Sequence, residues 1–206
     1  MIRNLILDMG GVILDVYYTM IIKNFAAYGV DARSLYTQAA QLPFIDEFEK
    51  GNITPAEFRN QVRNVTKTQL TDSEIDSVWN SMILSVRKES IALIGELKTK
   101  YDNIFLFSNT NEIHMQYVRT LFQKEIGFDI FTLLFNKSYL SNEIHLRKPD
   151  KESFVYILND ASVGANQTLF IDDTPQNIQG ASLAGIQTHL LAPPQTLNDL
   201  HNLKTI

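Results

Sequence analysis

The sequence predicts an α/β fold in which a doubly wound parallel sheet is wrapped by helices. Short apolar runs alternate with longer segments of helical period, and each run ends at polar residues or at glycine and proline. The rhythm is broken once, over residues 15–87, which show no clear strand and are expected to form several helices. This arrangement indicates a sheet domain with an inserted helical lid.

Five strands are expected, each short and rich in Leu, Ile and Phe. They cover residues 5–7, 104–107, 131–135, 168–171 and 188–191. Helical spacing of apolar residues predicts helices between the later strands and after the last one. These helices are expected over residues 113–121, 154–158, 174–185 and 196–203.

Two capping boxes mark helix starts inside the insertion. Thr54 precedes Glu57 by three residues, Thr71 precedes Glu74 by three, and an apolar helical pattern follows each pair. Three large apolar residues in these helices are expected in the core of the insertion rather than in contact with a ligand: Phe58, Trp79 and Met82.

Composition argues against nucleic-acid-binding proteins, cysteine-dependent enzymes and membrane proteins. The 206 residues fit one domain of ordinary size or one domain with a moderate insertion, and the net charge of -5 argues against a nucleic-acid partner. The absence of cysteine excludes thiolate nucleophiles and cysteine metal sites and fits a cytoplasmic location. No run approaches the roughly 18 apolar residues of a spanning helix, so no membrane partner is expected.

Polar residues that follow apolar strands carry the candidate chemistry. Ligands of an open parallel sheet gather outside the carboxyl ends of its strands, so these side chains should meet in one crevice. The residues that follow strands are Asp8, Ser108, Asn109, Asp172 and Asp173. Lys148, which precedes a proline and a predicted helix, is added to this set.

Three carboxylates at close range need a cation, because each charge raises the pKa of the others. An oxygen-only ligand set suits a hard ion, most simply Mg²⁺. Lys148 adds positive charge and Ser108 adds a hydrogen-bond donor, which together suit a phosphoryl group. The crevice is therefore interpreted as a phosphate site.

Four motifs in order resemble those of the haloacid dehalogenase superfamily. They are DMGG (Asp8 to Gly11), SN (Ser108, Asn109), RKPD (Arg147 to Asp150) and DDTPQNIQGA (Asp172 to Ala181). The resemblance implies a Rossmann-like core over residues 1–14 and 88–206 and a helical cap over residues 15–87. The LRKPD and DMGGV runs are particularly similar to the branch that contains glucose-1-phosphate phosphatases.

The resemblance also implies a reaction. Asp8 would take the phosphoryl group and the aspartyl phosphate would then be hydrolysed. The expected substrate is a small phosphorylated metabolite, foremost a sugar phosphate, and the expected assembly is a monomer or homodimer. Lys148 would orient Asp8 and bind phosphate, and Ser108 would donate to the phosphoryl oxygens.

The metal and the phosphate have separate expected partners. The implied Mg²⁺ ligands are Asp8, the carbonyl of Gly10, Asp173, and Asp172 directly or through water. The implied phosphate-binding or supporting residues are Gly10, Gly11, Asn109 and Asn177.

Gly10 departs from the family pattern, in which most phosphatases place a second aspartate that acts as acid and base. The absence of this aspartate should slow turnover by roughly 10²- to 10⁴-fold. The reduction should be smaller for a substrate with a good leaving group, such as a sugar 1-phosphate. Asp15 is considered as a substitute acid. His145 is a second departure, which either lines the site or reshapes its loop.

Two other functions stay open: a metal-independent 2-haloacid dehalogenase, and a non-catalytic phosphate-binding or regulatory protein. Each motif residue alone would more often be a turn or cap residue. Substrate choice should reside in the insertion. The candidates there are Tyr17, Tyr18, Phe44, Asp46, Glu47 and Glu49 to Gly51. The histidines at 114, 189 and 201 are expected to be structural.

Overall fold

The computed structural model describes residues 1–33, 35, 42–200 and 203 of the chain. Its main sheet has five parallel strands in the order β5-β4-β1-β6-β7. The strands are β1 (Asn4–Leu7), β4 (Asn103–Ser108), β5 (Lys137–Leu140), β6 (Thr168–Asp172) and β7 (Gln187–Leu190). Leu7 of β1 pairs with Leu106 on one side and Ile171 on the other, so these three strands end at one edge.

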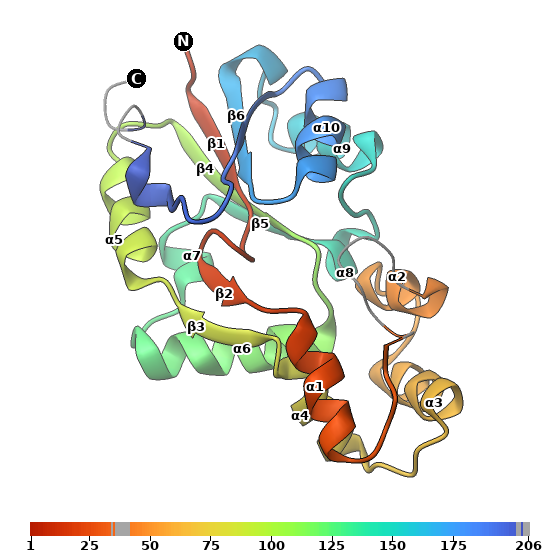
Figure 1. Cartoon of the computed structure of the whole chain (residues 1–206). Helices are drawn as coiled ribbons and strands as arrows, with labels where there is room; N and C mark the ends of the chain where they lie inside the picture. The colour runs from red at the N-terminus through yellow and green to blue at the C-terminus, as the bar shows by residue number, and fades with distance from the viewer. Residues whose placement is uncertain (34, 36–41, 201–202, 204–206) are drawn as a thin grey trace.

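Helices cover both faces of this sheet, as Figure 1 shows. One face packs on α5 (Lys88–Leu97) and α6 (Glu112–Glu125), and the other on α9 (Lys151–Asp160) and α10 (Pro175–Leu183). Alternate strand residues divide between the two cores: Leu5 and Leu7 belong to the first, and Ile6 to the second. The doubly wound parallel sheet is thereby confirmed.

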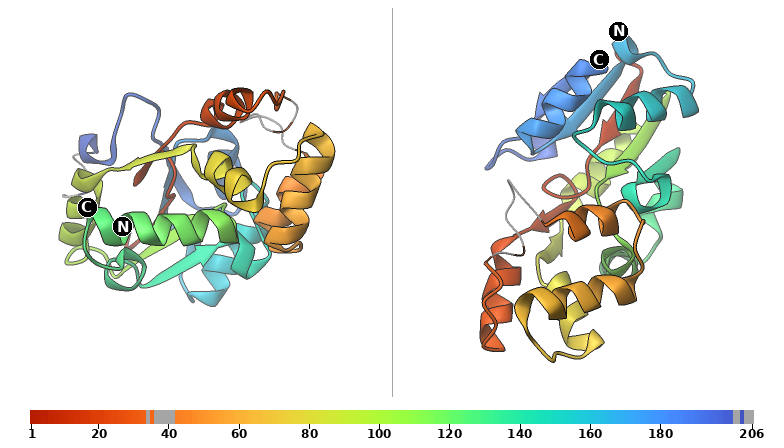
Figure 2. Two further views of the ribbon diagram at one scale, coloured as in Figure 1. Left: turned by 90° about the horizontal axis from the view of Figure 1, so that it is seen from below. Right: turned by 90° about the vertical axis from the view of Figure 1, so that its right-hand side faces the viewer.

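The insertion lies at one end of the sheet, as the right-hand view of Figure 2 shows. Its helices are α1 (Thr19–Ala27), α2 (Pro43–Glu49), α3 (Pro55–Thr66) and α4 (Asp72–Asn80). The expectation that it holds no strand is wrong, because β2 (Leu14–Val16) and β3 (Ile83–Val86) pair antiparallel where the chain leaves and re-enters the core. Strands of three and four residues are too short for an alternating pattern to mark them.

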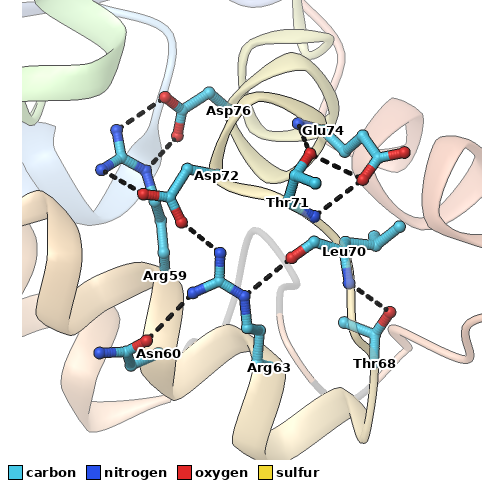
Figure 3. A network of polar contacts seen from close by, with 9 residues as sticks. All are labelled: Arg59, Asn60, Arg63, Thr68, Leu70, Thr71, Asp72, Glu74 and Asp76. Carbon is cyan, nitrogen blue, oxygen red and sulfur yellow. Dashed lines mark hydrogen bonds and ion pairs between the residues drawn. The ribbon is translucent and has the colours of Figure 1, made fainter.

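Both predicted capping boxes are present. The backbone N–H of Thr54 donates to Glu57 at 2.7 Å and that of Thr71 to Glu74 at 2.8 Å, while each threonine hydroxyl accepts in return. Figure 3 shows how ion pairs then join α3 to α4. Arg59 contacts Asp76 at 2.7 Å, and the guanidinium of Arg63 donates to the carbonyl of Leu70 and to Asp72.

The predicted strand over residues 131–135 is wrong. Residues Ile130–Leu133 form the short helix α7, because the Asp129 side chain caps it by accepting a hydrogen bond from the N–H of Phe131 at 3.0 Å. The strand lies a few residues later, at β5, on the edge of the sheet. Its sequence KSYL is mostly polar, so an apolar run could not reveal it.

The last predicted helix is also wrong in type. Leu197, Leu200 and Leu203 are buried as the helical spacing requires, but the described residues of this segment form the 3-10 turn η2 (Leu197–Asp199) and a 3-10 conformation at Leu203 instead of an α-helix. Residues 201 and 202 lie outside the described residues. Two further short elements complete the core: α8 (Ser141–Ile144) and the 3-10 turn η1 (Ala165–Gln167). None of the helices described is long and apolar enough to cross a membrane.

The predicted apolar core of the insertion is confirmed for Phe58 and Trp79. Phe58 stacks on Phe48 with ring centroids 4.3 Å apart and lies 4.7 Å from Trp79. Met82 is also buried, but it lines the cavity described below. The boundaries of the insertion at residues 15 and 87 stay a prediction.

Candidate active site

The loop after β1 brings Asp8 to the edge of the sheet. The N–H of Asp8 donates to the carbonyl of Ile171 at 3.0 Å, which holds β1 and β6 together to their ends. Gly11 has a φ of 66°, and a β-carbon there would overlap the carboxylate of Asp173. Glycine is therefore needed at this position for both conformation and space.

Lys148 is the centre of the polar cluster. Its ammonium lies 2.6 Å from Asp8 Oδ1 and 2.7 Å from Asp172 Oδ2, and its side chain is 1 % exposed. The rings of Phe107 and Phe170 lie within 5.5 Å of this nitrogen and exclude water from it. The lysine thus ties the end of β1 to the end of β6.

The carboxylates of Asp8, Asp172 and Asp173 converge. One oxygen from each lies within 4.8 Å of the others, so a single cation could contact all three. Asp172 is fully buried and also accepts hydrogen bonds from the N–H of Thr174 at 2.8 Å and from Asn177 Nδ2 at 3.0 Å. This oxygen set fits a hard divalent ion such as Mg²⁺.

The electrostatics of these carboxylates also favour a bound cation. Burial raises the pKa of Asp8 to about 8 against the attraction of Lys148, and the charges of Asp172 and Asp173 raise it further. Burial and Asp172 also raise the pKa of Asp173. Burial alone would lower the pKa of Lys148, but Asp172 and Asp8 raise it, so the lysine stays protonated. A cation among these groups would return Asp8 to its ionised form.

Both predicted asparagines have structural partners. Asn109 Oδ1 accepts from the N–H of Lys148 at 2.9 Å, and its Nδ2 donates to the carbonyl of the same residue at 2.8 Å. Asn177 holds Asp172 as described above. Ser108 is 3 % exposed and is the last residue of β4. These contacts place Asn109 and Asn177 as supports of Lys148 and Asp172.

A cavity of about 410 Å³ opens at this edge of the sheet, within the range of small-ligand sites. Six of the predicted site residues line it: Asp8, Gly10, Ser108, Asn109, Lys148 and Asn177. Gly11, Asp172 and Asp173 do not line it, although the two aspartates adjoin Asp8. The structure therefore brings the four motifs to one site.

The insertion contributes part of the cavity wall. Of the residues considered for substrate choice, Tyr18, Asp46 and Glu49 line the cavity, and the following do not: Tyr17, Phe44, Glu47, Lys50 and Gly51. Burial and the charges of Asp8, Asp173 and Glu49 raise the pKa of the Tyr18 hydroxyl, so it stays protonated.

Arg147 and His114 line the cavity as well, although the sequence pattern predicts a site role for neither. Arg147 contacts Asp46 at 2.5 Å and Glu49 at 2.8 Å. Its position directly before Lys148 in the RKPD motif was the only signal available. His145 does not line the cavity. Its Nδ1 donates to the carbonyl of Lys50 at 2.7 Å and its φ is 57°, so it shapes the loop.

Asp15 is not the substitute acid that was considered. Its carboxylate accepts from Ser85 Oγ at 2.5 Å and from Arg87 Nε at 2.7 Å, and it does not line the cavity. Burial alone would raise the pKa of Asp15, but the hydrogen bonds from Ser85 and Arg87 outweigh this and lower it. An ionised carboxylate cannot donate a proton.

The order of the motifs and the site geometry agree with a match to one family model, described as haloacid dehalogenase-like hydrolase, over residues 2–185. The chain belongs to the haloacid dehalogenase-like hydrolases. It is therefore a hydrolase, and the resemblance of its motifs to this family is confirmed.

Individual members of the family are similar over almost the whole chain. The D-ribitol-5-phosphate phosphatase of Bacteroides thetaiotaomicron is 29% identical over 189 residues, which cover 91% of each chain. A variant of the HAD family enzyme BT-2542 from the same organism, crystallised with magnesium and inorganic phosphate, superposes with a TM-score of 0.90 at 32% identity, covering 97% of this chain and 98% of that one.

A HAD-like family hydrolase from Porphyromonas gingivalis superposes with a TM-score of 0.86 at 26% identity, covering 100% of this chain and 97% of that one. The similarity thus includes the insertion as well as the sheet.

Proposed function

We propose that this hydrolase is a Mg²⁺-dependent phosphatase that cleaves a monophosphate ester of a small polyhydroxylated metabolite through an aspartyl phosphate on Asp8. The proposal rests on the position of the Lys148 ammonium, which lies 2.6 Å from Asp8 Oδ1 and 2.7 Å from Asp172 Oδ2. The carboxylate of Asp173 lies close to those of Asp8 and Asp172. The name of one relative, D-ribitol-5-phosphate phosphatase, and the complex of BT-2542 with magnesium and inorganic phosphate support the same chemistry.

The residues have separate roles in this proposal. Mg²⁺, held by Asp8, the Gly10 carbonyl, Asp173 and the more enclosed Asp172, would neutralise phosphate charge and so allow a carboxylate to approach it. Lys148 fixes the Asp8 carboxylate through Oδ1 and adds a positive charge beside the phosphoryl oxygens.

The reaction has two displacements. An Asp8 oxygen bonds to phosphorus as the ester P–O bond breaks, and the leaving oxygen takes a proton from water. Water then attacks phosphorus, the bond to Asp8 breaks, and inorganic phosphate leaves. Neither Gly10, which has no side chain, nor Asp15, which accepts a hydrogen bond from Arg87, supplies this proton, and in this proposal water does.

A panel of phosphate esters assayed with Mg²⁺ and with chelator tests the proposal, with Asp8→Asn as the control. We expect Mg²⁺-dependent release of phosphate by the wild type and a loss of at least about 10³-fold in the variant. A wild type as inactive as Asp8→Asn on every ester would refute it. A burst of phosphoenzyme without turnover would instead support the non-catalytic alternative, and chelator-resistant cleavage of a chlorinated acid would support a dehalogenase.

A further inference from the structure

The insertion places two carboxylates and one guanidinium in the wall of the cavity that also holds Asp8. Asp46 and Glu49 lie on α2, and Arg147 reaches them from the core loop that carries Lys148. Arg147 Nη1 lies 2.5 Å from Asp46 Oδ1, and its Nη2 lies 2.8 Å from Glu49 Oε2. This group, the Asp46–Glu49–Arg147 triad, carries a formal charge of -1 at neutral pH, since two carboxylates face one guanidinium.

Glu49 is held in place more firmly than a surface carboxylate. Its residue is 7% exposed, and its partner Arg147 is held by Asp46 as well. A buried carboxylate beside a shared cation keeps a defined orientation. A carboxylate oxygen accepts more than one hydrogen bond, so the contact with Arg147 does not prevent a ligand hydroxyl from donating to it.

The two parts of the cavity wall differ in charge. Lys148 and the expected Mg²⁺ favour the phosphate near Asp8, whereas a second phosphate or a carboxylate beside the triad would meet net negative charge in a partly dry site. Neutral hydroxyl groups would meet no such repulsion and would gain charge-assisted hydrogen bonds. An alkyl group would give the triad no new hydrogen-bond partner and would keep water away from its carboxylates.

We propose that the Asp46–Glu49–Arg147 triad determines specificity: it selects monophosphates whose organic part carries hydroxyl groups, and it excludes esters that carry a second anionic group. This inference rests on the proposed phosphatase function and deepens it. Asp46 and Glu49 come from the insertion, and Arg147 directly precedes Lys148 in the chain. The group proposed to contact the organic part of the substrate is therefore next to the residue that binds Asp8.

The test compares kcat/KM for four esters: ribitol 5-phosphate, pentyl phosphate, ribulose 1,5-bisphosphate and p-nitrophenyl phosphate. Glu49→Gln removes one negative charge and keeps the shape. We expect it to lower kcat/KM for ribitol 5-phosphate about 5- to 10-fold, because a charge-assisted hydrogen bond becomes a neutral one. It should leave pentyl phosphate unchanged and raise kcat/KM for the bisphosphate about 3-fold or more, because a repulsion is removed.

Glu47→Gln is the matched control. It makes the same substitution on the same helix, but Glu47 bonds Asn52 Nδ2 at 2.9 Å and does not line the cavity, so no ester should change. Asp46→Asn changes a more exposed member of the triad and should change kcat/KM for each ester in the same direction as Glu49→Gln. It replaces Glu49→Gln in the test if that variant does not fold.

Three outcomes separate the proposals. An equal fall for all esters in Glu49→Gln and Asp46→Asn would overturn the specificity role, since damage to the fold does not depend on substrate charge. A wild type that cleaves pentyl phosphate as well as ribitol 5-phosphate would overturn it too, while leaving the phosphatase function in place. Failure to cleave any ester, p-nitrophenyl phosphate included, refutes the phosphatase function itself.

Discussion

At the scale of single residues, Lys148 has two tasks that are usually separate. It compensates two buried carboxylates, Asp8 and Asp172, and it supplies positive charge to the cavity. A buried carboxylate without a partner either destabilises the fold or takes up a proton. Stability and chemistry therefore depend on the same ammonium group.

We predict that Lys148→Met lowers the free energy of unfolding by roughly 3 kcal/mol at pH 8 in chelator, because it leaves two carboxylates uncompensated. The loss should be smaller at pH 5, where Asp8 is protonated because burial raises its pKa to about 8. Urea unfolding at the two pH values measures both. Phosphatase activity should fall at least about 10²-fold. Lys151→Met, on the exposed side of α9, is the control, and equal stability of wild type and Lys148→Met at pH 8 would contradict the prediction.

At the scale of elements, one histidine joins the insertion to the core. His114 on α6 stacks on Trp79 of α4 with centroids 5.2 Å apart, and its Nε2 donates to the Trp79 carbonyl at 3.2 Å. Asn111 Nδ2 donates to the Nδ1 of the same ring at 3.1 Å, because Asn111 Oδ1 already accepts from the backbone. This arrangement requires the neutral ring, and burial lowers the pKa of His114 to about 4.

The neutral histidine predicts a specific pH dependence. A folded-state pKa of about 4 against a usual 6.5 means that His114 contributes fully to stability above pH 6.5, and that the contribution is lost as the pH falls to 4. The change amounts to about 3 kcal/mol. We expect the stability difference between wild type and His114→Gln to shrink over this range in chemical denaturation. His189→Gln is the control, and a difference independent of pH would rule the mechanism out.

Two glycines test how tightly the helices pack. A β-carbon at Gly180 of α10 would overlap the carbonyl of Pro149, the residue after Lys148, whereas a β-carbon at Gly95 of α5 would meet nothing within 4 Å. We predict that Gly180→Ala lowers stability by about 1 to 3 kcal/mol and reduces activity, since Pro149 must move. Gly95→Ala should raise stability by about 0.5 to 1 kcal/mol. Thermal unfolding of both variants measures these changes in stability. If Gly180→Ala is as stable and active as the wild type, the loop that contains Pro149 can move without cost and the prediction is wrong.

At the scale of the whole molecule, the proposed metal site joins distant parts of the chain. Asp8 follows β1, Asp172 ends β6 and Asp173 comes directly after it, with the insertion and most of the core between β1 and β6 in the chain. A ligand that contacts all three binds only the folded chain, so its binding energy adds to global stability.

We predict that Mg²⁺ raises the melting temperature, and raises it more at pH 8 than at pH 5.5. Without metal, the raised pKa of Asp8, about 8, means that its contribution to stability is present below pH 3.8 and is lost as the pH rises through 8. Mg²⁺ requires the ionised form, so protons compete with it at low pH. At about 100 times its Kd, Mg²⁺ should add roughly 2.7 kcal/mol.

Thermal unfolding in Mg²⁺ and in chelator measures this increment at each pH. Asp8→Asn cannot ionise at this position, so its increment should be smaller and depend less on pH. An equal Mg²⁺ increment at pH 5.5 and pH 8 in the wild type would contradict the assignment of Asp8 as a ligand.

The elements whose observed structure differs from the sequence prediction share a physical cause. Strand β5 was placed too early because its KSYL sequence lies at the sheet edge, where burial does not require an apolar run. Strands β2 and β3 are too short to show a pattern, and their pairing joins residues about 70 positions apart in the chain. Thr196 to Leu203 has helical spacing, but the described part of that segment packs its leucines from a 3-10 turn. In each case tertiary contacts outweighed a local pattern.

The sequence by itself determined which residues stand at the ends of the central strands. Asp8, Ser108 and Asp172 had to lie at one edge, because parallel neighbours in register end together. Only the tertiary structure decided which residues of α2 face the cavity. Asp46 and Glu49 do and Glu47 does not, because the helix is oriented by Arg147, a residue about a hundred positions away in the chain. Helical spacing defines the faces of a helix, but packing chooses which face meets the site.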